Sequence, residues 1–202
     1  MKKLLLLFTC FFALLTSNAQ DNRIAEKILD KVSVFLSNPE GVRIDFTGSE
    51  NGYLIMKGEK FYLNTQSIQS WYDGKTQWSY LTDNEEVNIS SPTKEEIQAI
   101  SPYHLLKRYK SDYTYIYIGQ SKRKGKLVHE INLTSKSDII NDIKLIISDD
   151  NKPVAILFYR NNKLMSEVNI TSLQTDSKID DKLFRFDKTK YPQVEIIDLR
   201  LE

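Results

Sequence analysis

Hydrophobic residues follow two different periods along the chain. Between residues 22 and 37 they recur every three or four positions, which predicts a helix with one apolar stripe. From Val42 the period becomes two, because Val42, Ile44 and Phe46 alternate with polar residues as in a strand with one buried face. Further strand-like segments are 53–56, 61–64, 68–72, 77–81, 86–90, 113–118, 127–133, 143–148, 154–159, 164–171 and 194–199.

A helical segment interrupts the strands between residues 92 and 108. Thr93 and Glu96 have the spacing of a capping box at a helix start, and Pro102 separates two short helical pieces. About a dozen strands at hairpin spacing, with helices at two places, predict one α+β domain that is mainly β. We expect a single curled antiparallel sheet, barrel-like, with the helices on one side.

Several strands are apolar on both faces, for example residues 115–118 and 154–158. A flat sheet with one wet face would not need this pattern. A curled sheet with helices against its concave side would bury such strands and could leave a cavity. A completely filled core explains the same composition equally well, so both interpretations stay open.

The first 19 residues have the three parts of a secretory signal peptide. Two lysines precede a run of about a dozen apolar residues, and the small residues Ser17 and Ala19 fit a peptidase site. The run is short for a bilayer span, which takes roughly 20 residues, although a short membrane anchor would have a similar sequence. We therefore expect residues 1–19, including the single cysteine Cys10, to be removed from an exported domain over residues 20–202.

Charge and composition exclude several classes of protein. The chain has 28 basic and 27 acidic residues, whereas a nucleic-acid-binding protein usually has a clear basic excess. Because the only cysteine lies in the expected signal peptide, no disulfide framework would hold the exported domain, and its stability must come from its core. We predict no nucleic-acid partner.

The sequence contains no arrangement of residues typical of an enzyme. Nucleophilic catalysis needs a Ser or Cys with a histidine base, and the histidines His104 and His129 accompany no nucleophile motif, so we interpret both as structural. The acidic pairs 149–150 and 180–181 could bind Ca²⁺. Solvated turns explain them better, because neither pair is followed by the ligand spacing of an EF-hand loop. The basic run 122–124 could contact an acidic partner or lipid headgroups, or simply be solvated. We predict no catalytic residue, metal site or cofactor.

Five short motifs are spread along the chain. They lie at residues 52–61, 73–80, 101–106, 184–186 and 192–200. The second reads D-G-K-T-Q-W-S-Y and is the most specific of them. The ordered set, after a signal peptide, resembles the LolA-type outer-membrane lipoprotein carriers of Gram-negative bacteria.

This resemblance implies an unclosed β-barrel with a helical lid over a hydrophobic cavity, in a monomeric periplasmic chaperone. Such carriers take a lipoprotein from an inner-membrane ABC-type lipoprotein-releasing complex, shield its acyl chains and pass it to an outer-membrane lipoprotein acceptor. On this basis the expected wall of the acyl-chain cavity is Val42, Ile44, Phe46, Leu54, Met56, Phe61, Leu63, Trp78 and Tyr80. The expected lid residues are Ile97, Ile100, Leu105 and Leu106.

One difference from the family concerns the lid. The family commonly carries Arg-Pro on the strand after the glycine, and this arginine fastens the lid. Counting from Gly52 places Gly58 at the position of the arginine, and counting back from Phe61 places Lys57 there, so neither provides a guanidinium group. The alternative function is therefore a non-carrier module on the same scaffold that binds lipids or lipoproteins or senses envelope stress, and a lipid hydrolase is a third hypothesis.

Overall fold

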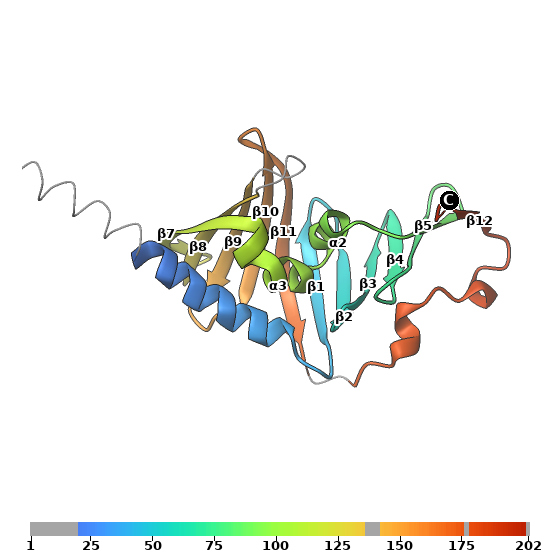
Figure 1. Cartoon of the computed structure of the whole chain (residues 1–202), viewed down its shortest axis with the longest axis horizontal. Coiled ribbons are helices and arrows are strands. Elements are labelled where there is room, and N and C mark those ends of the chain that lie inside the picture. The colour runs from blue at the N-terminus through green and yellow to red at the C-terminus, as the bar shows by residue number, and fades with distance from the viewer. Residues whose placement is uncertain (1–19, 136–141, 176–177, 201–202) are drawn as a thin grey trace, which may run out of the picture. The chain divides into compact units, whose positions relative to one another are not determined.

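The structure is a computed structural model that describes residues 20–135, 142–175 and 178–200 (Figure 1). The expected signal peptide, residues 1–19, lies outside the described residues. No helix in the described part of the chain combines the length and the apolar character needed to cross a membrane.

The chain divides into two compact units. Within the described part of the chain, unit 1 consists of the residues up to Val32 together with Tyr109–Met165. Unit 2 consists of Ser33–Arg108 together with the residues from Ser166 onward. Each unit therefore combines an early segment of the chain with a later one.

Twelve strands in the described residues follow the hydrogen-bonded order β12-β6-β5-β4-β3-β2-β1-β11-β10-β9-β8-β7. Their bounds are β1 Val42–Gly48, β2 Gly52–Lys57, β3 Lys60–Thr65, β4 Ile68–Tyr72, β5 Gln77–Leu81, β6 Glu86–Ser90, β7 Tyr113–Arg123, β8 Lys126–Ser135, β9 Asp142–Ser148, β10 Pro153–Arg160, β11 Lys163–Gln174 and β12 Glu195–Asp198. The order begins at β12 and ends at β7, so the sheet formed by these strands is not closed. The expected mainly β fold with an unclosed sheet is confirmed.

The α-helices fall where the sequence pattern placed them, as an N-terminal helix over residues 20–36, α2 Lys94–Ile100 and α3 Pro102–Asp112. The short 3₁₀ helices η1 Asp181–Phe184 and η2 Lys188–Lys190 are not predicted by the sequence pattern. At the start of α2 the Thr93 and Glu96 side chains each bond the other's backbone N–H, which confirms the predicted capping box. The last strand departs from the expected antiparallel sheet, because β12 pairs parallel to β6.

Short turns connect the strands of unit 2. At the Asp-Gly turn between β4 and β5, Asp73 Oδ1 accepts hydrogen bonds from the backbone N–H groups of Lys75 at 3.1 Å and Thr76 at 2.9 Å. Gly74 adopts φ +98°, which glycine reaches without steric cost. The turn brings Trp71 opposite Trp78, so its geometry determines which face each residue of β5 joins.

One face of the unit 2 sheet carries an aromatic core. Its buried members are Ile55, Tyr62, Trp71, Ile179 and Phe184. The C-terminal segment, residues 178–194, supplies the last two and covers this face. Gly41 allows its close approach, because a Cβ there would lie 2.3 Å from Ile179 Cδ1 and 2.9 Å from the Met56 carbonyl oxygen. The segment before β1, at Gly41, and the C-terminal segment, at Ile179, are therefore packed against each other.

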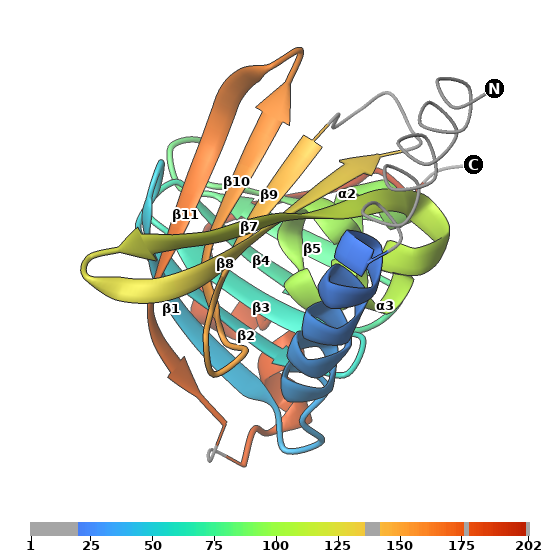
Figure 2. The same ribbon diagram turned by 90° about the vertical axis from the view of Figure 1, so that its left-hand side faces the viewer.

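In unit 1 the N-terminal helix lies beside the last turn of α3 (Figure 2). Its apolar stripe is buried, with Ala25 and Leu29 completely inaccessible to solvent. Tyr109 Oη donates a hydrogen bond of 2.7 Å to Asp30 Oδ1, and Lys110 Nζ lies 2.7 Å from a carboxylate oxygen of Glu26. The predicted amphipathic helix is thus confirmed, and it packs by both apolar and polar contacts.

The strands of unit 1 bury residues on both faces. On β9 the consecutive residues Leu145, Ile146 and Ile147 are all buried, although successive side chains of a strand point to opposite sides. Val128 and Ala155 pack with Ile146 in one cluster. Packing on both faces therefore holds for β9, but not for residues 115–118 of β7, where Ile116 and Ile118 are 37% and 55% exposed.

Candidate functional site

The second face of the unit 2 sheet is apolar on strands β1 to β3 and becomes polar on β4 and β5, where it carries Ser70 and Ser79. Strand register places Ile44 opposite Leu54, and Leu54 opposite Leu63, and paired residues share a face. By the same register this surface, called the lid-side face below, contains Val42, Ile44, Phe46, Leu54, Met56, Phe61 and Leu63. Seven of the nine residues expected to line a cavity therefore lie together.

Trp78 and Tyr80 do not belong to this group. Trp78 is paired with Trp71, and Trp71 with Tyr62, which places it on the aromatic face. Tyr80 lies on the same face and packs against Tyr191, with ring centroids 5.1 Å apart. The expectation that all nine residues share one wall is therefore wrong for these two, because the register across β3, β4 and β5 puts them on the opposite side.

Helices α2 and α3 cover the lid-side face of unit 2 (Figure 1). The buried Ser101 between them donates a hydrogen bond of 3.4 Å from Oγ to Met56 Sδ. The His104 ring contacts Tyr72 edge-on at 6.1 Å between centroids, and Tyr72 in turn packs on Phe61 at 5.3 Å. These contacts place the helical pair, called the lid below, over strands β2 to β4.

The lid presents apolar side chains inward. Ile97, Leu105 and Leu106 are buried, and Ile100 is half-buried. Their spacing follows the helical period, as the sequence predicted. The lid is short, since α2 has seven residues, and helices of this length are marginal without packing. Its stability therefore depends on what it covers.

A polar latch fastens the lid to the β2–β3 turn. Gly58, with φ +55°, forms the tight turn that leaves Glu59 beside the lid. His104 Nε2 lies 2.8 Å from Glu59 Oε2, and Lys107 Nζ forms an ion pair with Glu59 Oε1. Glu59, His104 and Lys107 are called the latch below. None of the three is predicted by the sequence pattern, because a charged turn residue and a lone histidine are both common on surfaces.

The surroundings of the latch lower the pKa values of both Glu59 and His104, but for different reasons. Burial raises the pKa of the Glu59 carboxyl, but the hydrogen bonds and charges of Lys107 and His104 outweigh burial, so its pKa lies below the ordinary value. Burial lowers the pKa of the His104 imidazole, and the opposing effect of Glu59 does not restore it. His104 Nδ1 is buried without a hydrogen-bond partner in the described part of the chain. These conditions favour a neutral His104 that donates from Nε2 to the Glu59 carboxylate.

A small pocket lies beside the latch. It has a volume of about 220 Å³ and is lined by residues that include Glu59, Tyr72, Ile97 and His104. Pockets that bind drug-sized ligands are larger, at roughly 300–1,000 Å³. The lid therefore lies close to the sheet at this point.

The Lys57 side chain lies on the aromatic face of the sheet, where it contacts the C-terminal segment. Its ammonium donates a hydrogen bond of 2.9 Å to the Ile179 carbonyl oxygen and lies 3.0 Å from Asp181 Oδ1. Lys60 pairs with the second oxygen of Asp181 at 2.6 Å. Neither of the two candidate positions for the family's arginine contributes to the latch, because Lys57 holds the C-terminal segment and Gly58 forms the turn.

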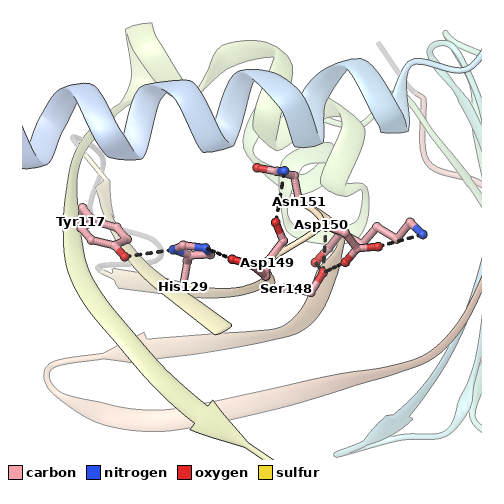
Figure 3. Close-up of polar contacts among 7 residues, drawn as sticks. Tyr117, His129, Ser148, Asp149, Asp150 and Asn151 are labelled. Carbon is pink, nitrogen blue, oxygen red and sulfur yellow. Dashed lines mark hydrogen bonds and ion pairs between the residues drawn. The ribbon is translucent and has the colours of Figure 1, made fainter. Parts of the chain in front are cut away.

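A second polar cluster lies in unit 1, around His129 (Figure 3). Tyr117 Oη lies 2.9 Å from His129 Nδ1, and His129 Nε2 lies 3.4 Å from Asp149 Oδ1. Burial raises the pKa of Tyr117 above its ordinary value. In the neighbouring turn Ser148 Oγ donates to Asp150 Oδ1 at 2.5 Å. The histidine joins two strands and a turn, in keeping with a structural role.

The acidic pairs are engaged in local contacts. Asp150 pairs with Lys152 at 3.0 Å, and Asp180 caps η1 by accepting from the Lys182 backbone N–H. Across the described ranges 20–135, 142–175 and 178–200, no three His, Cys, Asp or Glu side chains are grouped so that they could hold a metal ion.

Comparison with known families identifies the class of protein. Residues 15–162 match the family model described as outer membrane lipoprotein carrier protein LolA. The match covers more than half of the chain, and the chain belongs to this family. No curated protein sequence matches it.

The chain is also similar to several solved structures, at low sequence identity. A protein from Thermus thermophilus, described as an uncharacterized conserved protein, has a TM-score of 0.62 at 14% identity, over 86% of this chain and 98% of that one. A putative outer membrane lipoprotein-sorting protein domain from Vibrio parahaemolyticus has a TM-score of 0.46 at 11% identity, over 82% and 97%. The Pseudomonas aeruginosa MucA/MucB complex contains a chain with a TM-score of 0.44 at 13% identity, over 79% of this chain and 60% of that one.

Proposed function

We propose that this protein is a periplasmic carrier that shields the acyl chains of lipoproteins and shuttles them from the inner to the outer membrane. Residues 20–202 would act as one carrier domain after export by residues 1–19. The observation that carries the proposal is the lid-side face of unit 2, where seven apolar side chains lie beneath helices fastened by a polar latch. Membership of the carrier family supports it.

The physical requirement on such a carrier is reversibility. Burying an acyl chain of roughly 16 carbons, at about 0.8 kcal/mol per CH₂, is worth on the order of 10 kcal/mol. The membrane offers the same burial, so the carrier has to bind its cargo without trapping it. A lid fastened by one partly exposed ion pair and one hydrogen bond suits this requirement, since an exposed ion pair contributes only about 0–1 kcal/mol and opens readily.

The partners follow from the same proposal. An inner-membrane ABC-type lipoprotein-releasing complex would load the lid-side face, and an outer-membrane lipoprotein acceptor would unload it. The cavity would form when α2 and α3 move away from Leu54, Met56 and Leu63, with Ile97, Leu105 and Leu106 as the inner surface of the lid. A ligand then stabilises the open state by its differential affinity for it.

The test is to purify the exported protein from envelope extract and to identify by mass what accompanies it. We expect triacylated lipoprotein, released when an outer-membrane acceptor is added. Phe46→Glu, on the lid-side face, should abolish cargo binding, whereas Tyr80→Glu, half-buried on the opposite face, should leave it intact.

Two results would contradict the proposal. One is a folded protein that takes up no fluorescent fatty-acid probe and carries no lipoprotein. The other is equal cargo binding by the wild type and Phe46→Glu, with both variants shown to be folded by circular dichroism. Lipoprotein that binds but is never passed to an acceptor would favour the alternative, a sensing or binding module.

A further inference from the structure

The tip of the β7–β8 hairpin in unit 1 concentrates positive charge. Four of the five residues from Lys122 to Lys126 are cationic, in a chain whose basic and acidic residues are otherwise almost balanced. Leu127 follows directly and is 40% exposed. The tip thus combines a dense positive charge with an exposed large apolar side chain.

Strand register shows that this tip extends beyond the neighbouring strands of unit 1. Pairing of β8 with β9 begins at Val128 and Ser148, whereas pairing of β7 with β8 continues to Lys122–Leu127 and Arg123–Lys126. The last rungs therefore form a two-stranded ribbon without a third strand beside it in the described sheet (Figure 2).

The tip places a lysine in a left-handed backbone conformation, which is less favourable for lysine than for asparagine or glycine. Lys124 has φ +49° and Gly125 has φ +78°, a conformation for which Asn-Gly or Gly-Gly is the favoured pair. The β10–β11 hairpin of the same unit has asparagines, Asn161 and Asn162, at the corresponding positive φ values. The lysine is the less favourable residue locally, which points to a use for its charge.

The neighbouring acids do not neutralise the tip. Glu130 lies 3.5 Å from Lys144 Nζ, Asp149 contacts His129, and Asp150 pairs with Lys152. Within the described residues no carboxylate forms an ion pair with Lys122, Lys124 or Lys126. Three lysine charges at the tip are therefore available to a partner.

We propose that the β7–β8 tip docks the protein on the surface of a membrane that contains anionic phospholipids. The lysines 122, 124 and 126 would lie among the headgroups, where each adds to binding, and Leu127 would enter the interface. A protein partner fits less well, because a ribbon tip two residues wide offers far less than the ≈ 800 Å² per partner of a standard interface. The proposal does not depend on the carrier function, although it would bring a carrier to the membranes that it serves.

The test is binding of the cargo-free full-length mature protein to vesicles, measured by co-sedimentation. Vesicles of phosphatidylethanolamine with phosphatidylglycerol should bind the wild type, and vesicles of phosphatidylcholine alone should not. The triple variant Lys122→Gln, Lys124→Gln, Lys126→Gln should lose affinity by on the order of 100-fold, at about fivefold per lysine. Raising the salt to about 0.5 M should abolish binding of the wild type.

A matched control removes three positive charges from other parts of the protein. The triple variant Lys31→Gln, Lys75→Gln, Lys163→Gln alters three exposed lysines in three different segments of the chain and should keep its affinity within about threefold. Equal loss in both triple variants, or no binding of the wild type to anionic vesicles, would overturn the proposal. Loss of cargo delivery by the tip variant with undiminished vesicle binding would also overturn it, in favour of an acidic protein partner. Uptake of a fatty-acid probe in solution should be the same in both triple variants, which separates this proposal from the carrier function.

Discussion

The two faces of the unit 2 sheet both carry apolar side chains on β2 and β3, yet they are covered in different ways. The aromatic face is closed by the C-terminal segment, whose rings interlock with the sheet: Trp71 lies 5.4 Å from Phe186 and 6.0 Å from Tyr191 between centroids. The lid-side face is closed by two short helices whose polar contacts with the sheet include the latch and the bond from Ser101 to Met56. The C-terminal segment therefore contacts the sheet mainly through packed aromatic rings, and the lid mainly through buried aliphatic side chains and polar contacts.

This difference indicates which cover can open. Interlocking aromatic rings bury a large area and hold rigid geometry, so separating them costs several kcal/mol. In the latch the charges of Glu59 and Lys107 are partly exposed, so water can solvate them when they separate. A protein that must expose one apolar surface on demand, without unfolding, needs this combination of a permanent cover and a releasable one.

The largest effect is expected on the aromatic side. Phe184 is completely buried in the aromatic core, and Phe184→Ala should lower the free energy of unfolding by about 3–5 kcal/mol. Urea titration followed by tryptophan fluorescence would measure it. Ile97→Ala on the lid should cost less, because the lid can settle onto the sheet. If Ile97→Ala destabilises the protein more than Phe184→Ala, the comparison of the two covers is incorrect.

A smaller and local effect is expected from the latch. Glu59→Gln removes the carboxylate that His104 and Lys107 share, and should cost about 1 kcal/mol, which corresponds to roughly fivefold more frequent opening of the lid. Hydrogen exchange of the amides in residues 94–108 would report this opening.

The matched control is Lys57→Gln, two residues away on the opposite face. It should accelerate exchange in the C-terminal segment, which Lys57 holds, and leave the lid unchanged. A lid that opens faster in Lys57→Gln than in Glu59→Gln would show that Lys57 fastens the lid after all.

The smallest effect is expected from pH. Because the folded pKa of His104 is lowered, the unfolded chain binds more protons below the ordinary value of 6.5, and stability should fall as the pH drops through this range. The lowered pKa of Glu59 acts in the same direction below its ordinary value of 4.5. Thermal midpoints at about pH 7.5 and 5.5 should therefore differ more for the wild type than for His104→Gln. An equal difference in the two proteins would exclude His104 as the source.

Local patterns were sufficient for the elements of the fold. The helical period of residues 22–37 and the alternation in Val42, Ile44 and Phe46 each predicted the observed element, because both depend on neighbours in sequence. Of the nine wall residues expected from the family resemblance, seven share the lid-side face. Trp78 and Tyr80 do not, since the face of a strand after a turn depends on the geometry of that turn and on register, which the pattern within one strand does not contain.

The sequence by itself therefore determined the mainly β class, the helical interruption between the strands and the apolar content of each strand. These follow from periodicity, which is a property of adjacent residues. Only the tertiary structure decided that Glu59 meets His104 and Lys107 across 45 or more residues, and that Lys57 instead holds the C-terminal segment. Such pairings depend on which faces of the packed elements contact each other. These contacts form only when the sheet packs against the lid and the C-terminal segment.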